Sequence, residues 1–142
     1  MLLQRDRSVL VVVDVQTALL PAIPAASQVL ARIAVLVRAA RRIGVPVRIT
    51  EENPDGLGQT VAEIATLVDR SAILRKMAFN AAAEDDFMRR FVALGRSQAV
   101  LCGVEAHVCV LQTALGLKAA GVDAFVVDDA VADRKSTRLN SS

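Results

Sequence analysis

The sequence predicts an α/β fold, a three-layer α/β/α domain in which helices cover both faces of a parallel sheet. Short apolar runs of strand length alternate with segments whose apolar residues recur at helical spacing, the order expected of right-handed βαβ units. Hydrophobic residues make up 54% of the 142 residues, whereas aromatic residues make up only 3%. The core must therefore consist mainly of Val, Leu, Ile and Ala, which suits strands buried between two layers of helices.

The predicted elements follow one another without a linker or an internal repeat. We expect strands at residues 8–13, 45–50, 72–75, 99–102 and 122–127, and helices at 25–43, 61–67, 84–94 and from about 107 to 120. Gly44, Gly95 and Gly121 each end a predicted helix, and Gly103 is expected to break the fourth strand. The predicted apolar stripes of the first and last helices are Val29, Ile33, Leu36, Val37 and Ile43, and Val108, Leu111 and Leu115.

The formal net charge of +2 comes from the end of the chain. Residues 134–142 hold three basic residues and no acidic one, and without them 14 basic and 15 acidic residues remain. The basic balance therefore predicts neither a nucleic-acid partner nor an anionic membrane partner. The small number of aromatic residues also argues against recognition of nucleic acid by base stacking.

The two cysteines, Cys102 and Cys109, do not make a disulfide framework. A reduced setting is therefore expected, with Cys102 in the core of a strand. The N-terminus lacks the order of a signal peptide, and the apolar run 9–13 is too short to cross a bilayer. We expect a cytoplasmic protein with no membrane partner.

Three chemically useful residues stand at or just beyond the ends of predicted strands. Asp14 follows the first strand, Lys76 follows the third, and Cys109 lies in the first turn of the helix after the fourth. The carboxyl ends of parallel strands meet at one edge of a sheet, where α/β proteins bind their ligands. Unpaired N–H groups and the helix dipole at Cys109 would favour a thiolate. Taken singly, Asp14 could cap a turn or pair with an arginine, and Lys76 could be solvated.

Two acidic segments are weaker candidates for binding a substrate or a metal. The polar loop 51–58 could hold a substrate or a metal, or could simply connect two elements on the surface. Asp128 and Asp129 could bind a metal, but adjacent residues point in different directions, so a turn or capping role is expected. The glycine motifs that bind dinucleotides or phosphates do not occur, and no cofactor is expected.

Three segments together resemble the isochorismatase-like cysteine hydrolases. Residues 11–16 (VVVDVQ) resemble the family's first-strand Asp motif, residues 75–79 its lysine motif, and residues 103–110 (GVEAHVCV) its nucleophile motif. Residues 128–131 resemble the segment after its fifth strand. Order and spacing agree over roughly residues 8–133, and three motifs in order are far more specific than one.

The resemblance implies a sheet in the order 3-2-1-4-5-6 and a triad of Asp14, Lys76 and Cys109. It also implies a cis peptide between Val104 and Glu105, which turns backbone N–H groups towards the reacting oxygen. The residues placed around that oxyanion are Val104, Glu105, Ala106 and Cys109. Residues expected to line a small, partly apolar substrate pocket are Gln16, Leu20, Phe79 and His107.

Two departures from the family narrow the expected reaction. Nicotinamidases of the family bind a metal through an Asp-x-His and a further His, but His107 is the single histidine here, so no metal is expected. True isochorismatases cleave a vinyl ether and lack the cysteine that this chain has. The chain is therefore closest to the uncharacterised hydrolase branch. His107 stands two residues from Cys109 and faces elsewhere on a helix, which favours a structural or substrate-lining role.

The expected function is hydrolysis of a small amide-type C–N bond through a Cys109 thioester, with Asp14 as acid and base. A catalytically silent interaction protein on the same fold is one alternative. A thiol redox protein is another, although no Cys-x-x-Cys or nearby resolving cysteine occurs. The sequence does not name the substrate.

The end of the chain departs from the family, whose members continue for roughly forty more residues. We expect residues 1–133 to be a C-terminally shortened domain that lacks the sixth strand and last helices. Residues 134–142 have no apolar periodicity and resemble translated vector or adaptor sequence, so a non-native tail is expected. A homo-oligomer is expected where the full-length domain is present.

Overall fold

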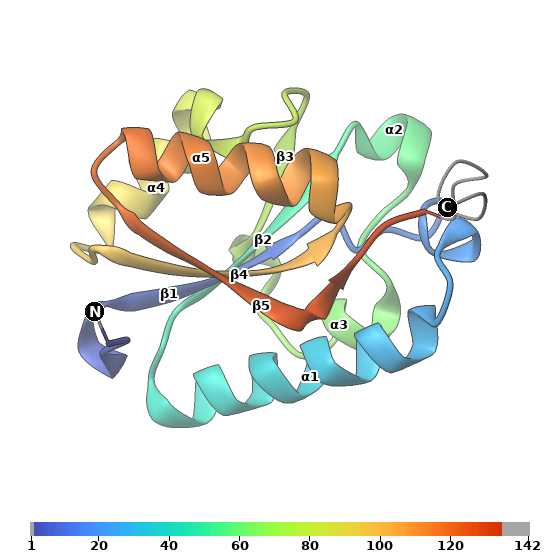
Figure 1. The fold of residues 1–142 in the computed structure, drawn as a ribbon, viewed down its shortest axis with the longest axis horizontal. Coiled ribbons are helices and arrows are strands. Elements are labelled where there is room, and N and C mark those ends of the chain that lie inside the picture. Colours follow the sequence, from blue (N-terminus) through green and yellow to red (C-terminus); the bar gives the residue numbers. More distant parts are fainter. Residues whose placement is uncertain (1, 135–142) are drawn as a thin grey trace, which may run out of the picture.

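Five parallel strands form one sheet in the order β3-β2-β1-β4-β5 (Figure 1). The structure is a computed structural model and describes residues 2–134. The strands are β1 (Ser8–Val13), β2 (Val47–Glu52), β3 (Ile73–Lys76), β4 (Gln98–Val104) and β5 (Asp123–Ala132). The predicted fold class and the predicted order of the first five strands are confirmed. Residues 2–134 contain no sixth strand.

Helices cover both faces of the sheet and make the predicted three layers (Figure 1). The helices α1 and α3 lie on one face, and α4 and α5 lie on the other. A π-helical turn, Ala106–Val110, leads from β4 into α5. The helices are α1 (Ala26–Ile43), α2 (Pro54–Leu57), α3 (Ala62–Ala65), α4 (Asp85–Ala93) and α5 (Leu111–Ala119).

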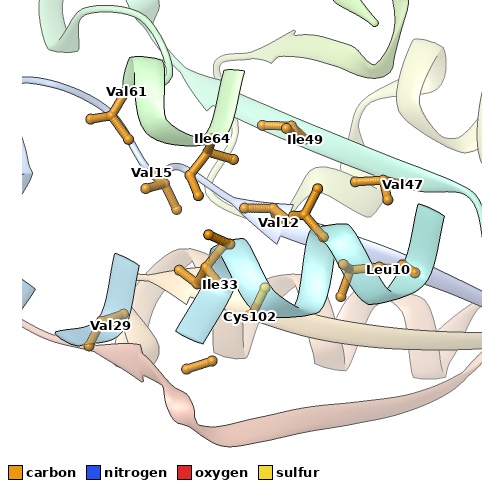
Figure 2. Packing of buried hydrophobic residues seen from close by; sticks show 14 of the residues in the cluster. Leu10, Val12, Val15, Val29, Ile33, Val47, Ile49, Val61, Ile64 and Cys102 are labelled. Carbon is orange, nitrogen blue, oxygen red and sulfur yellow. The ribbon is translucent and has the colours of Figure 1, made fainter. Parts of the chain in front are cut away.

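Strand β1 is buried along its whole length, and its alternate side chains supply two separate hydrophobic clusters. Leu10 and Val12 pack under α1 with Ile33 and with Cys102 of β4 (Figure 2). On the opposite face the cluster under α4 and α5 is built from Val9, Val11, Val13, Leu74, Phe87, Phe91, Leu101, Cys109 and Leu117. Cys102 is fully buried, which confirms its predicted place in the core.

Helix α1 follows its sequence prediction closely. Gly44 ends it in the left-handed conformation, with φ of +81°, and donates its N–H to the carbonyl groups of the last turn. Val29, Ile33 and Val37 are buried as predicted, but Ile43 is half-exposed because it borders a surface cavity near the N-terminus. No helix within residues 2–134 combines the length and apolar character needed to cross a bilayer.

Strand β2 is displaced by two residues from its predicted position. Pro46 has no N–H to donate, and its carbonyl accepts the N–H of Leu10 just before the strand begins. At the other end the strand continues to Glu52, paired residue by residue with β3. Glu51 and Glu52, predicted in a loop, are therefore buried strand residues, and only the following residues form a surface turn.

Strand β4 passes through Gly103 instead of ending there. Gly103 pairs with Val13 of β1 and has φ of +120°. A Cβ atom at Gly103 would lie 2.1 Å from the backbone oxygen of Val13. Glycine is thus required for the close approach of β1 and β4, and the expectation of a strand break was wrong.

Two further predictions at the C-terminal end were wrong. Asp128 and Asp129 lie within β5 instead of a turn, because β5 resumes pairing with β4 after a register shift and runs on to Ala132. In α5 the predicted stripe is exposed at Leu111 and Leu115. The π-helical turn adds a residue per turn and rotates the helix that follows, so Thr113 and Leu117 face the core instead.

The predicted tail begins where the described residues end. Arg134 is described, and its Nε donates to Glu105 Oε2 at 3.0 Å. The rest of the predicted tail, residues 135–142, lies outside the described residues, and the domain boundary at residue 133 stays a prediction.

Replacing Gly103 with alanine should cost more stability than replacing Gly95, which has φ of +65° and nothing within 4 Å of an added Cβ. We expect Gly95→Ala to lower the free energy of unfolding by about 1–2 kcal/mol, the cost of left-handed backbone. Gly103→Ala should lower it by a further ~1–3 kcal/mol, because the backbone of Val13 must move. Urea unfolding followed by circular dichroism measures both, and equal losses would contradict the close-approach argument.

Candidate active site

Asp14 leaves the end of β1 in a conformation that carries its carboxylate across to the α4–α5 face of the sheet. By strand alternation it would follow Leu10 and Val12 towards α1. Its φ of +53° instead places it in the left-handed region, which aspartate tolerates better than most residues. The hydroxyl of Thr50 donates to Oδ1 at 2.8 Å, and the Asp14 side chain is fully buried.

Lys76 holds the centre of the site with an ammonium group that is almost completely buried. Its Nζ donates to Asp14 Oδ2 at 3.0 Å and to Glu52 Oε1 at 2.8 Å. It also donates to the carbonyl oxygens of Ala78 at 3.1 Å and Phe79 at 3.3 Å. Burial lowers the pKa of Lys76, but Asp14 and the hydrogen bond to Glu52 outweigh it and raise the pKa above its ordinary value.

Glu52 is a site residue that the sequence interpretation missed. It is the last residue of β2, and it stands beside Lys76 in the β2–β3 register. Glu52 could have been found by the same criterion as Asp14 and Lys76, because it is a charged residue at the end of a buried strand. It was overlooked because β2 was expected to end at Thr50.

Gln16 supports Glu52 and does not line the site as predicted. Its Nε2 donates to the carbonyl oxygens of Glu52 at 2.9 Å and Gly58 at 2.8 Å, and its Oε1 accepts the N–H of Glu52 at 2.8 Å. The Gln16 side chain is fully buried and both ends of its amide are engaged within the protein. Gln16 therefore acts as a positioning residue that fixes the end of β2.

Cys109 lies in the π-helical turn, facing the two carboxylates. Its Sγ and one carboxylate oxygen from each of Asp14 and Glu52 all lie within 4.8 Å of one another. Burial raises the pKa of the thiol to about 12, and the negative charge of Asp14 contributes in the same direction, whereas Lys76 opposes them. Lys76 lowers this pKa, as expected of a nearby cation, but burial and Asp14 outweigh it, so the net shift is opposite to the expected one. The free protein holds a neutral thiol next to a carboxylate.

The turn that carries Cys109 is held together by backbone hydrogen bonds. The peptide between Val104 and Glu105 is cis. The Glu105 carbonyl accepts the N–H groups of Val108 at 3.2 Å and Val110 at 3.1 Å. Ala106 is the first residue of the turn. The residues predicted around an oxyanion thus lie on one tightly bonded segment that ends at the nucleophile candidate.

His107 points away from the thiol. Its ring Nδ1 pairs with Asp133 Oδ2, and its backbone N–H donates to Asp133 Oδ1 at 3.0 Å. Most of the His107 side chain is exposed. The contacts tie the π-helical turn to the end of β5, so a structural role accounts for His107 and a role as base for Cys109 has no geometric support.

The loop 77–83, whose carbonyl groups bind Lys76, is anchored at both ends. Glu84 Oε1 accepts the N–H groups of Met77 at 2.6 Å and Ala78 at 3.1 Å, and these two hydrogen bonds lower the pKa of Glu84. Thr113 Oγ1 of α5 accepts the N–H of Ala81 at 3.0 Å. The side chain of Phe79, a predicted lining residue, is largely exposed beside this loop.

Leu20, the remaining predicted lining residue, belongs to the other side of the sheet. It is partly buried and packs against the cluster under α1, whereas Cys109 belongs to the cluster under α4 and α5. The structure therefore gives Leu20 a packing role and does not bring it together with the triad residues.

A metal ion at this site would have to compete with Lys76. Within residues 2–134, the group of potential ligands is Asp14, Glu52 and Cys109. The Lys76 ammonium already bonds to both carboxylates, so the position that a cation would take holds a positive charge. The donor set and its charge therefore do not fit a resident metal ion.

Comparison with known proteins identifies the family. Residues 8–140 match the model of the isochorismatase domain. The chain belongs to the isochorismatase family. A curated relative, isochorismatase domain-containing protein 2A of Mus musculus, is 33% identical over 132 residues. The match covers 91% of this chain and 61% of the relative, so the chain spans about three fifths of that relative's length. The predicted family is confirmed.

Solved structures of isochorismatase-family proteins share the fold. The YcaC gene product of Escherichia coli, described as an octameric hydrolase of unknown specificity, has a TM-score of 0.88 at 25% identity. The match covers 98% of this chain and 70% of that one. YcaC from Pseudomonas aeruginosa, solved with hexane-2,5-diol and covalent acrylamide, has a TM-score of 0.88 at 26% identity, covering 98% and 71% of the two chains.

Lys76→Met should be strongly destabilising, because Asp14 and Glu52 would stay buried without their shared ammonium. We expect the free energy of unfolding to fall by about 3–5 kcal/mol in urea at neutral pH. Arg75→Met is the matched control, since the neighbouring pair between Arg75 and Asp55 is exposed and should cost less than about 1 kcal/mol. Similar losses in the two variants would show that the buried network contributes little to stability.

Alkylation of Cys109 by iodoacetamide should report its raised pKa. At pH 8 a thiol with a pKa of about 12 holds roughly 10⁻⁴ of its population as thiolate, so alkylation should be about a thousandfold slower than for free cysteine. Asp14→Asn should move the midpoint of the pH–rate curve downwards, because a charge that disfavours the thiolate is removed. Peptide mapping separates Cys109 from Cys102, and an unchanged midpoint would exclude Asp14 as a cause.

Proposed function

We propose that this isochorismatase-family chain is a cysteine hydrolase that cleaves a small amide-type C–N bond. The observation that carries the proposal is the neutral thiol of Cys109 next to the carboxylate of Asp14, whose charge is held by Lys76. A thiol needs a base in order to attack a carbonyl carbon, and a buried carboxylate within 4.8 Å of the thiol sulfur is placed to serve as one.

In the first half of the proposed reaction, Asp14 takes the thiol proton while Cys109 Sγ attacks the carbonyl carbon. The carboxylate has lone pairs left for this proton after bonding Thr50 and Lys76. The tetrahedral intermediate then collapses, the C–N bond breaks, and protonated Asp14 gives the proton to the leaving nitrogen. An amine departs and a thioester remains on Cys109.

In the second half, water hydrolyses the thioester. The oxygen of the water molecule attacks the thioester carbon while Asp14 takes a proton from that water. The C–S bond breaks, the proton returns to Sγ, and a carboxylic acid leaves. Lys76 keeps its positive charge throughout and stabilises the ionised form of Asp14, so the cycle requires no metal and no cofactor.

The oxyanion of both tetrahedral intermediates needs hydrogen-bond donors. The N–H of His107 is already engaged with Asp133, and those of Val108 and Val110 with the Glu105 carbonyl. We assign the role to the backbone N–H groups of Ala106 and Cys109, the first and fourth residues of the π-helical turn. We expect Phe79 and the rest of loop 77–83, whose carbonyl groups bind Lys76, to line the approach to the thiol.

A thiol redox function is less well supported than hydrolysis. Cys102 and Cys109 belong to hydrophobic clusters on opposite faces of the sheet, so neither can resolve an oxidised form of the other. Burial also raises the pKa of Cys102 to about 12, which makes it inert. A redox role would need a thiol from another molecule.

The protein is proposed to be a cytoplasmic homo-oligomer that acts on a small molecule. Leu111 and Leu115 are about half-exposed on the outer side of α5, where a second subunit could cover them. The E. coli relative is octameric, which supports assembly by this fold. No feature of residues 2–134 calls for a nucleic acid.

Trapping of an acyl-enzyme tests the proposed function directly. The protein is mixed with a panel of small amides and esters, and with acrylamide as a general electrophile, and intact mass is recorded in a single turnover. We expect an acyl adduct on the wild type and on the control variant Cys102→Ala, and none on Cys109→Ala. In Asp14→Asn, acylation by the amides should slow by about 10²–10⁴-fold.

The alternatives give different results in the same experiment. Folded wild type that forms no adduct with any amide or ester indicates a catalytically silent interaction protein. Reversible oxidation of Cys109 by peroxide, with no acyl adduct, indicates a thiol redox protein. An acyl adduct that persists in Cys109→Ala overturns Cys109 as the nucleophile.

A further inference from the structure

A polar cavity lies on the opposite face of the sheet from Cys109. Strand alternation sends Glu52 to the α4–α5 face and its neighbour Glu51 to the α1–α3 face, the side of Ile49. There Glu51 lines a cavity of about 270 Å³ between the end of β2, the edge strand β3 and helix α3. The cavity shares no lining residue with the candidate active site.

Glu51 presents a buried carboxylate that lacks a counter-charge. It is 7% exposed, and its Oε2 accepts the backbone N–H of Thr60 at 2.7 Å and the Thr60 hydroxyl at 2.6 Å. The other carboxylate oxygen, Oε1, has no hydrogen-bond or ion-pair partner within residues 2–134. Every fully buried polar side-chain atom in this part of the chain does have a partner, so Oε1 is not fully buried. Because Glu51 lines the cavity, Oε1 must open onto it.

The rim of the cavity carries the opposite charge. Arg70 and Arg75 both line it and are exposed. Arg75 pairs with Asp55 at 3.1 Å, whereas Arg70 has no ion-pair or hydrogen-bond partner within residues 2–134. Asp55 lines the cavity too and offsets one of the two arginines, so the edge carries a net charge of +1. Neither guanidinium lies within ion-pair distance of Glu51 among the described residues, so the cavity has a negative floor and a positive edge.

These charges select for a ligand that carries both signs. An unpaired buried carboxylate is costly, and a cation bound to Oε1 would offset that cost. The net positive rim repels a simple cation or a metal ion, whereas Arg70, which has no partner within residues 2–134, can bind a carboxylate in a bidentate fork beside Arg75. A molecule with an ammonium at one end and a carboxylate at the other satisfies both requirements.

We propose that this cavity is a second binding site, for a small zwitterion whose ammonium meets Glu51 and whose carboxylate meets Arg70 and Arg75. The cavity volume of about 270 Å³ has room for a simple amino acid, because it corresponds to roughly nine water molecules at about 30 Å³ each in the liquid. The site does not depend on the proposed hydrolase function, since it uses no residue of that machinery.

The test is titration of ¹⁵N-labelled protein with a chain-length series: glycine, β-alanine, 4-aminobutyrate and 5-aminovalerate. The Thr60 amide, which donates to Glu51, is the reporter. We expect saturable shifts for at least one member. Butylamine and butyrate each carry one of the two charges and should bind at least tenfold more weakly. Cys109→Ala should bind as the wild type does, which separates this cavity from the candidate active site.

Two variants each remove one of the charges that are proposed to bind the ligand. Glu51→Gln, which retains an acceptor for Thr60, should weaken binding at least tenfold. Arg70→Gln changes an exposed residue whose side chain has no hydrogen-bond or ion-pair partner within residues 2–134, and it should weaken the preference for the amino acid over butylamine. Absence of saturable shifts with the whole series, or binding that is unchanged in both variants, overturns the proposal.

Discussion

One buried ammonium group holds the carboxyl ends of three neighbouring strands together. Lys76 comes from β3, and its two carboxylate partners come from the ends of β1 and β2. Burying a charge is costly unless the charge is paired and hydrogen-bonded, and this ammonium has four oxygen acceptors. The parallel register that sets Glu52 beside Lys76 is therefore an electrostatic requirement as well as a packing result.

The same network decides the state of the thiol. Two carboxylates share one ammonium, so the surroundings of Cys109 contain more negative than positive charge, and burial adds to the effect. The start of a helix alone would favour a thiolate, but partial charges at a helix end are weaker than a full carboxylate nearby. The free site therefore holds a neutral thiol, and the proposed attack requires transfer of its proton to Asp14.

Much of this arrangement could be predicted from the sequence. Alternation of strand and helix patterns identified the fold class, and Asp14, Lys76 and Cys109 stood out as reactive groups at strand ends. Glu52 was missed because its partner is 24 positions away in the chain, and an acidic residue without a visible partner is normally assigned to a loop. Leu111 was wrongly predicted to face the core. The prediction assumed the regular spacing of an α-helix, and the spacing of apolar residues in the sequence does not reveal the π-helical turn that rotates α5.

Two adjacent glutamates at the end of β2 point to opposite faces of the sheet, and each belongs to a different polar region of the molecule. Glu51 belongs to the cavity by α3, and Glu52 belongs to the network around Lys76. Insertion or deletion of a single residue inside the strand would exchange the two side chains between the two regions and leave both without their partners. Evolutionary changes in length must therefore fall in the connections on either side, before Val47 or after Glu52. The length of β2 is therefore fixed by the need to keep Glu51 on one face of the sheet and Glu52 on the other.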